Sequence, residues 1–154
     1  MFHIVLYEPE IAPNTGNIIR LCANTGAFLH LVGPLGFSMN DQRLRRAGLD
    51  YHEFAAVRQH DSMAAFLRNI QPPRLLALST RGATLYTAVD YLQGDALLFG
   101  PETRGLPDDI LGQLPAGHIL RVPMRPHSRS LNLANTAAVV LYEAWRQHDF
   151  GGCR

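Results

Sequence analysis

The chain has 154 residues and a mass of 17.1 kDa, with 47% apolar residues, 18% charged residues and a net charge of +1. This size and apolar content predict one compact domain over residues 1–154, and they exclude a disordered tail and a large multidomain enzyme. The uncharged stretch at 130–142 is interrupted by asparagines and is shorter than the roughly 20 residues of a membrane span, so no membrane partner is expected.

Neither the amino terminus nor the cysteines indicate export or a metal site. The first residues place no basic segment before a short apolar run, which does not resemble a signal peptide, so a cytoplasmic protein is expected. Cys22 and Cys153 are far apart and neither belongs to a Cys-x-x-Cys pair. We therefore expect no disulfide framework and no metal.

All 14 basic residues are arginines. Arginine binds phosphate through a planar fork and stacks on bases, so the placement of these residues matters more than their number. Six of them form two groups, one of Arg43, Arg45 and Arg46 and the other of Arg121, Arg125 and Arg129. Each group fits either a solvated face or a track for phosphates.

The first half of the chain alternates short apolar runs with candidate helices. Strands are predicted over residues 2–7, 29–32 and 54–57. The helices predicted here start at Asn14 or Thr15 and stop at Gly26, start at Asn40 or Asp41 and run through Arg46, and start at Asp61 or Ser62 and run through Asn69.

The second half repeats this alternation. Strands are predicted over residues 75–78, 95–100 and 119–122, the first of them after the helix stop at Pro72-Pro73. Pro107 fits the first turn of a helix through Leu114, and a last helix is predicted from about Ser130 to Gln147. Strands that are apolar throughout and separated by helices predict an α/β fold, with a mainly parallel sheet covered by helices on both faces.

The last predicted helix is apolar around most of its circumference, which exceeds the need of a helix with one buried side. Burial in a subunit interface explains this pattern, and a central helix in a monomer is the alternative. Its apolar residues include Leu131, Leu133, Ala134, Ala138, Val140, Leu141 and Trp145.

Several familiar catalytic motifs are missing. The chain has no lysine for a P-loop and no Gly-x-Gly-x-x-Gly, and the segment from His52 lacks the second histidine of a zinc protease. It also has no Gly-x-Ser-x-Gly nucleophile elbow. Nucleotide hydrolysis, dinucleotide redox chemistry and zinc hydrolysis therefore lose support.

Three other segments are unusual. In the first, helical spacing puts Asn17, Arg20 and Asn24 on one stripe, which could receive an anion or simply face solvent. In the second, the strand at 95–100 leads through Gly100-Pro101 to Glu102, at the strand end where ligands of open α/β sheets bind. A tight turn with a surface ion pair is the alternative.

The third segment runs from Val122-Pro123-Met124 to the start of the last helix. Ser130 could be the cap of this helix. Asn132 would then lie in the first turn, where asparagine is a weak helix former, and an amide facing a pocket would explain its presence.

Taken together, these segments resemble the three motifs of the SPOUT superfamily of RNA methyltransferases. The motifs occur in order as Asn14-x-Gly16-Asn17-x-x-Arg20, Gly100-Pro101-Glu102-x-x-Gly105, and Val122-Pro123-Met124 with Ser130-Leu131-Asn132. The flanks at 7–11, 43–51 and 142–146 resemble the members that methylate the ribose 2'-hydroxyl of the wobble nucleotide, cytidine or uridine, in tRNA. The match covers nearly the whole chain and includes no separate RNA-binding domain.

The resemblance implies a deep trefoil knot in the C-terminal half, a homodimer, and S-adenosylmethionine as the cofactor. The knot would involve the strands that end near Leu78, Gly100 and Val122 together with the last helix. The residues implied to bind the cofactor are Leu78, Gly100, Gly105, Val122, Ser130 and Leu131.

The resemblance also implies the catalytic set Arg20, Glu102, Ser130 and Asn132. Because arginine keeps its proton, we expect Arg20 to hold the target phosphate and to stabilise negative charge on the reacting oxygen. The proton would pass to the phosphate or to Glu102. In a dimer, Arg20 would reach a cofactor held by the other subunit.

The expected partner is the anticodon stem-loop of tRNA, contacted by Asn17, Arg20, Arg43, Arg45 and Arg46. Methylation of another tRNA position or of ribosomal RNA is the nearest alternative, because the motifs indicate the reaction but not which nucleotide is methylated. A catalytically silent RNA-binding dimer would retain the same fold. A metabolic α/β enzyme with a small substrate would explain the alternating pattern but not the three motifs together.

Overall fold

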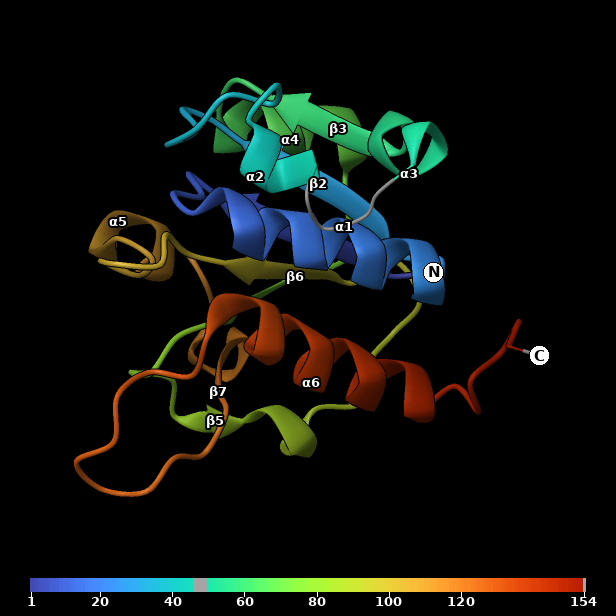
Figure 1. Cartoon of the computed structure of the whole chain (residues 1–154). Coiled ribbons are helices and arrows are strands. Elements are labelled where there is room, and N and C mark those ends of the chain that lie inside the picture. Colours follow the sequence, from blue (N-terminus) through green and yellow to red (C-terminus); the bar gives the residue numbers. More distant parts are fainter. Residues whose placement is uncertain (46–49, 154) are drawn as a thin grey trace.

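The computed structural model describes residues 1–45 and 50–153. Within them, seven strands form one sheet in the order β3-β2-β1-β6-β4-β7-β5, and all paired neighbours run parallel (Figure 1). The strands are β1 (His3–Tyr7), β2 (Phe28–Val32), β3 (Val57–His60), β4 (Leu75–Leu78), β5 (Thr84–Leu85), β6 (Ala96–Phe99) and β7 (Ile119–Arg121).

The helices in the same ranges cover both faces of this sheet, which confirms the predicted α/β class. They are α1 (Ala12–Thr25), α2 (Gln42–Arg45), α3 (Tyr51–Ala55), α4 (Met63–Ile70), α5 (Asp108–Leu111) and α6 (Leu133–Arg146), with short 3-10 turns η1 (Tyr86–Ala88) and η2 (Ala116–His118). None of the helices in this part of the chain is long and apolar enough to cross a bilayer.

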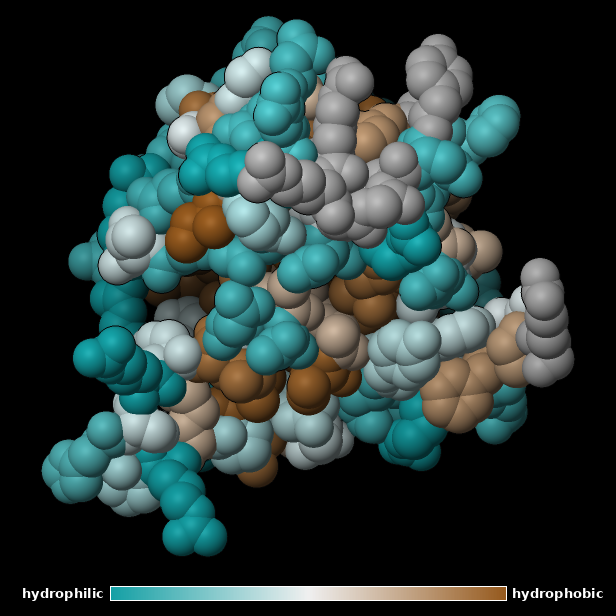
Figure 2. Space-filling view, viewed as in Figure 1, coloured by the Kyte–Doolittle hydropathy of each residue, from teal (hydrophilic) through white to brown (hydrophobic). Residues whose placement is uncertain are grey.

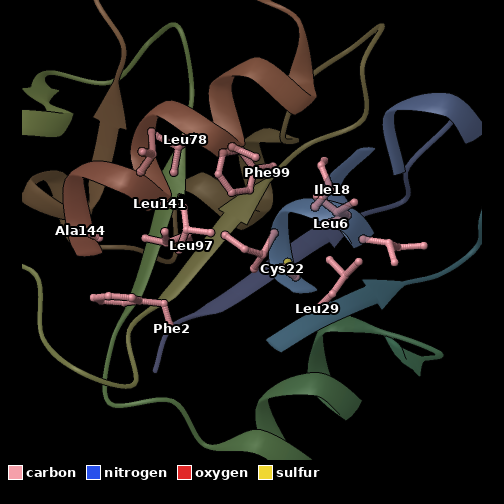
Figure 3. Packing of buried hydrophobic residues seen from close by; sticks show 14 of the residues in the cluster. Phe2, Leu6, Ile18, Cys22, Leu29, Leu78, Leu97, Phe99, Leu141 and Ala144 are labelled. Atoms are coloured by element: carbon pink, nitrogen blue, oxygen red, sulfur yellow. The ribbon is translucent and has the colours of Figure 1, made fainter. Parts of the chain in front are cut away.

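Alternation along the central strands divides the core into two layers. Ile4 and Leu6 of β1 belong to the cluster that α1 and α6 cover, whereas Val5 belongs to the cluster on the opposite face, with residues of α4 and α5. Figure 3 shows the first cluster, where Leu78 and Phe99 lie beside α6 and Leu29 lies near α1. Central strands that are apolar on both faces are therefore buried on both faces.

Two of the predicted elements are wrong in position. The strand predicted over 54–57 lies further along the chain, at β3 from Val57 to His60, because Asp50 and Glu53 form a reciprocal capping box that starts α3. The helix predicted from Pro107 through Leu114 is shorter, since α5 ends at Leu111. The Ser62 cap of α4 is confirmed.

The start of α1 also differs from the prediction. The helix begins at Ala12, before Asn14 and Thr15, and Pro13 lies in its first turn, where a missing N–H costs nothing. Neither Asn14 nor Thr15 is the cap, and the capping residue Ile11 offers no side-chain acceptor. The predicted stop is confirmed, because Gly26 adopts φ 75°, which glycine tolerates.

A row of three imidazoles crosses β1, β2 and β3. His3 Nδ1 lies 2.9 Å from His30 Nε2, and His30 Nδ1 lies 3.0 Å from His60 Nε2. Burial, and then repulsion from the two neighbouring imidazoles, lowers the pKa of His30 to about 3. Burial also lowers the pKa of His3 and of His60, with smaller contributions from the amino terminus for His3 and from Arg58 for both.

This row is expected to make the protein less stable as the pH falls below about 6.5. Below this pH, His30 is protonated in the unfolded chain but stays neutral in the folded protein. Its contribution to the free energy of unfolding is therefore constant above about pH 6.5 and declines by about 1.4 kcal/mol per pH unit below it. Urea unfolding of wild type and His30→Leu at pH 7, 6 and 5 checks the expected smaller slope in the variant. His127→Asn, at an exposed imidazole, is the control, and an unchanged slope in His30→Leu would contradict the assignment.

Candidate active site

A cleft of about 430 Å³ opens at the carboxyl ends of β4, β6 and β7 and is bounded by the segment that leads into α6. Figure 2 shows the surface hollowed between α5 and the start of α6. The lining comes from the loop after β4 (78–81), the end of β6 and its loop (99–106), the segments after β7 (122, 124 and 130–133), and Ile11, Asn14 and Thr136. The cleft therefore lies where ligands of parallel sheets bind.

The tertiary structure brings together all six residues predicted to bind the cofactor. Leu78 pairs in register with Phe99 of β6 and with Leu120 of β7, so the three strand ends lie side by side. The predicted residues that line the cleft are Leu78, Gly100, Gly105, Val122, Ser130 and Leu131. Their role in binding a ligand stays a prediction.

Gly100 is required by the chain's own loop. A Cβ atom at this position would lie 2.4 Å from the Leu106 nitrogen and 2.6 Å from the Gly105 carbonyl carbon. The loop is turned back toward the strand end by a hydrogen bond from the Gly105 nitrogen to the Pro101 oxygen, and Gly105 itself adopts φ 68°. Gly100 thus allows the wall of the cleft to form.

Glu102 supplies the acceptor that the start of α1 lacks. Its Oε2 accepts a hydrogen bond from the Glu10 nitrogen at 2.8 Å, and its Oε1 accepts from the Ile11 nitrogen at 3.2 Å and from Asn14 Nδ2 at 3.4 Å. A carboxylate at this end of a helix is also favoured by the helix dipole. Glu102 therefore fixes α1 against the loop that follows β6.

Asn132 connects α6 to the same contacts. Its Oδ1 accepts hydrogen bonds from the Ala134 and Asn135 nitrogens, so Asn132 is the cap of α6, and the alternative of a Ser130 cap is wrong. Asn132 Nδ2 donates to Asn14 Oδ1 at 3.0 Å. Asn14, which the sequence analysis gave as a candidate helix cap and as the start of the first motif but not as a site residue, thus joins Glu102 to Asn132. Its position at the head of the first motif was the available signal.

A second pair of contacts ties the loops after β1 and β6. The Thr103 nitrogen donates to Glu10 at 3.0 Å and its hydroxyl donates to the same carboxylate at 2.8 Å, which lowers the pKa of Glu10. Arg104 forms an ion pair with Glu8, not with the adjacent Glu102. These bonds stabilise the wall that Glu102, Thr103 and Arg104 contribute to the cleft.

Arg20 is not among the residues that line the cleft of its own chain. It lies on α1 between the exposed Asn17 and Asn24, and its Nε is 2.8 Å from Glu53 Oε1 of α3. Its side chain is 43% exposed, against 14% for Glu53. The sequence motif placed Arg20 in the catalytic set but gave no signal for its partner Glu53.

The predicted phosphate track is described only in part. Arg43 forms a fork with Asp41, with Nε and Nη2 donating to the two carboxylate oxygens at 3.2 and 2.8 Å. The side chain of Arg45 and all of Arg46 lie outside the described residues. The role of this group in RNA binding stays a prediction. Among the side chains that the structure does describe, no group of three or more His, Cys, Asp or Glu is placed to hold a metal ion.

The surface near α6 keeps large apolar side chains exposed. Leu131, Val139 and Tyr142 are each more than a third exposed in the single chain. Figure 2 shows apolar residues gathered over this helix. The opposite side of α6 is buried through Ala137, Val140, Leu141 and Ala144. The helix is therefore apolar on its buried side and on part of its outer side.

The chain is similar in sequence to a known protein family and to named enzymes. The model of the SpoU rRNA Methylase family matches residues 1–142. The tRNA (cytidine(34)-2'-O)-methyltransferase of Escherichia coli K12 is 61% identical, over 99% of this chain and 97% of the relative.

Two solved structures are also similar. A structure described as giving insights into the 2-OH methylation of C/U34 on tRNA superposes with a TM-score of 0.88 at 47% identity, covering 97% of both chains. The SpoU methyltransferase AviRb of Streptomyces viridochromogenes, in complex with AdoMet, has a TM-score of 0.85 at 25% identity, covering 97% of this chain and 61% of AviRb.

Proposed function

This chain belongs to the SpoU rRNA methylase family, and we propose that it transfers a methyl group from S-adenosylmethionine to the ribose 2'-hydroxyl of nucleotide 34, cytidine or uridine, in tRNA. The observation that carries this proposal is the 61% identity, over 99% of the chain, to a relative with that named activity. The cleft at the carboxyl ends of β4, β6 and β7 agrees with it, because its lining includes Asn14 of the first motif and residues of the second and third motifs.

The cleft fits the cofactor. Its volume of about 430 Å³ lies within the range of small-molecule sites, and its wall combines apolar side chains with the backbone of two loops. Leu78, Val122 and Leu131 would contact the apolar parts of S-adenosylmethionine, and the polar groups near Gly100, Gly105 and Ser130 would bind the rest. Bound there, the cofactor would supply a methyl group on a sulfonium, from which a neutral thioether departs as a good leaving group. The AdoMet complex of AviRb supports this assignment.

The protein's part in the reaction is to orient the ribose and to stabilise charge. Arg20 holds the phosphate beside the target ribose and stabilises negative charge on the 2'-oxygen. Asn132, fixed as a helix cap and by Asn14, orients the reacting group. Glu102 already accepts three hydrogen bonds, so its role is to position α1, and the proton passes to the RNA phosphate.

Two copies of the chain complete the site. Arg20 is outside the cleft of its own chain, and the exposed apolar residues near α6 supply a surface on which a second copy can pack. In this homodimer, Arg20 of one protomer serves the cleft of its partner. RNA contacts come from the same small domain, through Asn17, Arg20 and the arginines at 43, 45 and 46. The fold carries the trefoil knot of the SPOUT superfamily, and the enzyme works in the cytoplasm on tRNA.

The test uses purified protein, S-adenosylmethionine and tRNA that lacks ribose methylation at nucleotide 34. Nuclease digestion and mass mapping are expected to find one added methyl group on that ribose. Methylation at another tRNA position or in ribosomal RNA would retain the family and overturn the substrate. Cofactor binding without transfer to any of these RNAs would favour a silent RNA-binding dimer.

A further inference from the structure

Glu53 makes two sets of contacts that join a local helix cap to Arg20. Its Oε2 accepts a hydrogen bond from the Asp50 nitrogen at 2.8 Å, while its own nitrogen donates to Asp50 Oδ1 at 3.0 Å. Its Oε1 lies 2.8 Å from Arg20 Nε. One oxygen thus completes the capping box of α3 and the other reaches across to α1, which packs beside α3 (Figure 1).

The cap makes Glu53 a fixed anchor. A carboxylate held by a backbone N–H loses rotamer freedom before it meets its ionic partner, and Glu53 is mostly buried, with 14% of its side chain exposed. Forming an ion pair with such a group costs less side-chain entropy than forming an ordinary surface pair between two mobile side chains. The pair is therefore suited to set the direction of Arg20.

The atom that is held also matters. Nε is the guanidinium nitrogen nearest to the stem, and an ion pair at this atom, with the carboxylate oxygen at 2.8 Å, restrains the position of the whole guanidinium. A guanidinium is also the group that binds phosphate through a planar fork of N–H donors, so its placement decides whether it can act on RNA.

We propose that Glu53 is the positioning residue for Arg20, holding its guanidinium through the ion pair at Nε in the place where it meets the RNA. The inference rests on the proposed function, because it gives Glu53 a task only if Arg20 acts on RNA. Glu53 itself touches neither substrate nor cofactor in this proposal. It acts through Arg20, and its loss should change turnover more than binding.

Glu53→Gln separates the two roles of this side chain, the capping of α3 and the ion pair with Arg20. Glutamine completes a capping box as glutamate does, so α3 keeps its start. Its neutral amide cannot form the ion pair with Arg20, and once its single oxygen accepts from the residue 50 nitrogen, its NH2 group is the part turned toward the guanidinium. We expect kcat for methyl transfer to fall about 10- to 100-fold. The KM for tRNA should not rise, because removal of a carboxylate makes this surface more positive.

Asp50→Ala is the matched control. It removes the oxygen that caps α3 but leaves the residue 50 nitrogen, to which Glu53 can still bind, and it leaves the pair with Arg20. If Glu53 mattered only for the stability of α3, Asp50→Ala would lower kcat as much as Glu53→Gln does. We expect kcat within about twofold of wild type. Melting temperature and S-adenosylmethionine affinity report whether each variant is folded.

A second test introduces Glu53→Gln into a chain that already carries Arg20→Lys. Lysine has no planar guanidinium whose orientation Glu53 could set, because its ammonium is a single charged group that rotates freely at the end of the side chain. Adding Glu53→Gln to Arg20→Lys should therefore lower kcat by less than about twofold. If Glu53→Gln does not fold, Glu53→Asp keeps the charge but is one methylene shorter, and it should show a smaller loss of kcat with no rise in KM.

The outcomes are distinct. Loss of kcat without a rise in KM, absent in Asp50→Ala and largely absent in the Arg20→Lys background, supports the proposal. Wild-type kcat in a folded Glu53→Gln, an equal loss in Asp50→Ala, or a full additional loss in Arg20→Lys would overturn it while leaving the proposed function intact. Wild-type protein that transfers no methyl group to tRNA would instead overturn the proposed function, and the role of Glu53 with it.

Discussion

Arg20→Ala is expected to lower methyl transfer to tRNA at least about 100-fold and to leave S-adenosylmethionine affinity unchanged. The loss follows from removing the cation that stabilises negative charge on the 2'-oxygen. Cofactor affinity stays because the role proposed for Arg20 is to hold the RNA phosphate and the 2'-oxygen, and the predicted cofactor-binding residues are left unchanged. Single-turnover rates and calorimetric titration with S-adenosylmethionine measure the two effects. A variant with the wild-type rate would contradict the role given to Arg20.

Mixed dimers test which subunit supplies Arg20. Arg20→Ala and Asn132→Ala chains are each expected to be inactive alone. If Arg20 serves the partner's cleft, a randomly mixed population should regain about one quarter of wild-type activity, because half of the dimers are mixed and each has one intact site. If each cleft uses its own Arg20, the mixture stays inactive.

A double variant supplies the reverse control for these mixtures. A chain that carries both Arg20→Ala and Asn132→Ala is paired with a wild-type chain, and the mixed dimer is isolated by different tags. With Arg20 acting on the partner's cleft, neither site in this dimer is intact and no transfer is expected. With Arg20 acting on its own cleft, the wild-type chain would keep one working site, which would contradict the shared arrangement.

Gly100→Ala is expected to have the second large effect. The added Cβ would lie 2.4 Å from the Leu106 nitrogen and 2.6 Å from the Gly105 carbonyl carbon, and both are backbone atoms that cannot rotate away. The loop that forms one wall of the cleft must therefore move. We expect a loss of about 1–3 kcal/mol in the free energy of unfolding from overpacking. Methyl transfer should fall with it.

Calorimetry with S-adenosylmethionine separates a loss of cofactor binding in Gly100→Ala from its loss of stability. At a temperature where the variant is folded, its affinity for the cofactor should be at least about tenfold weaker than that of wild type, equivalent to about 1.4 kcal/mol. Gly117→Ala is the matched control, because a Cβ there meets nothing within 4 Å. A folded Gly100→Ala with wild-type cofactor affinity would show that this loop does not hold the cofactor.

Much of the fold follows from local patterns. The apolar runs at 75–78 and 95–100 predict β4 and β6, since a short segment without polar residues is stable only when both of its faces are buried. Gly26 and Ser62 are found where their chemistry places them, at a helix end and a helix start. The prediction failed at 54–57, where the capping box at Asp50 and Glu53 favours a helix over the β-rich composition.

The candidate site, like the fold, could be predicted only in part from the sequence. The three motifs and their order identify the family from the sequence alone, and they include the cleft residues Gly100, Glu102 and Asn132. They do not show that Asn14 connects the last two, because these contacts join residues 88 and 118 positions apart in the chain. Nor do they show that Arg20 is held by Glu53 and lies outside the cleft of its own chain.

The sequence by itself thus determined the class of fold, the family and the motif residues that line the cleft, because these depend on local burial patterns and on residue types at short spacings. The tertiary structure decided which side chains meet. In a parallel sheet, the order of the strands brings the loops at their carboxyl ends together whatever their separation in the chain. The partners of Glu102, Asn14 and Arg20 follow from that order and from helix packing, which no local pattern contains.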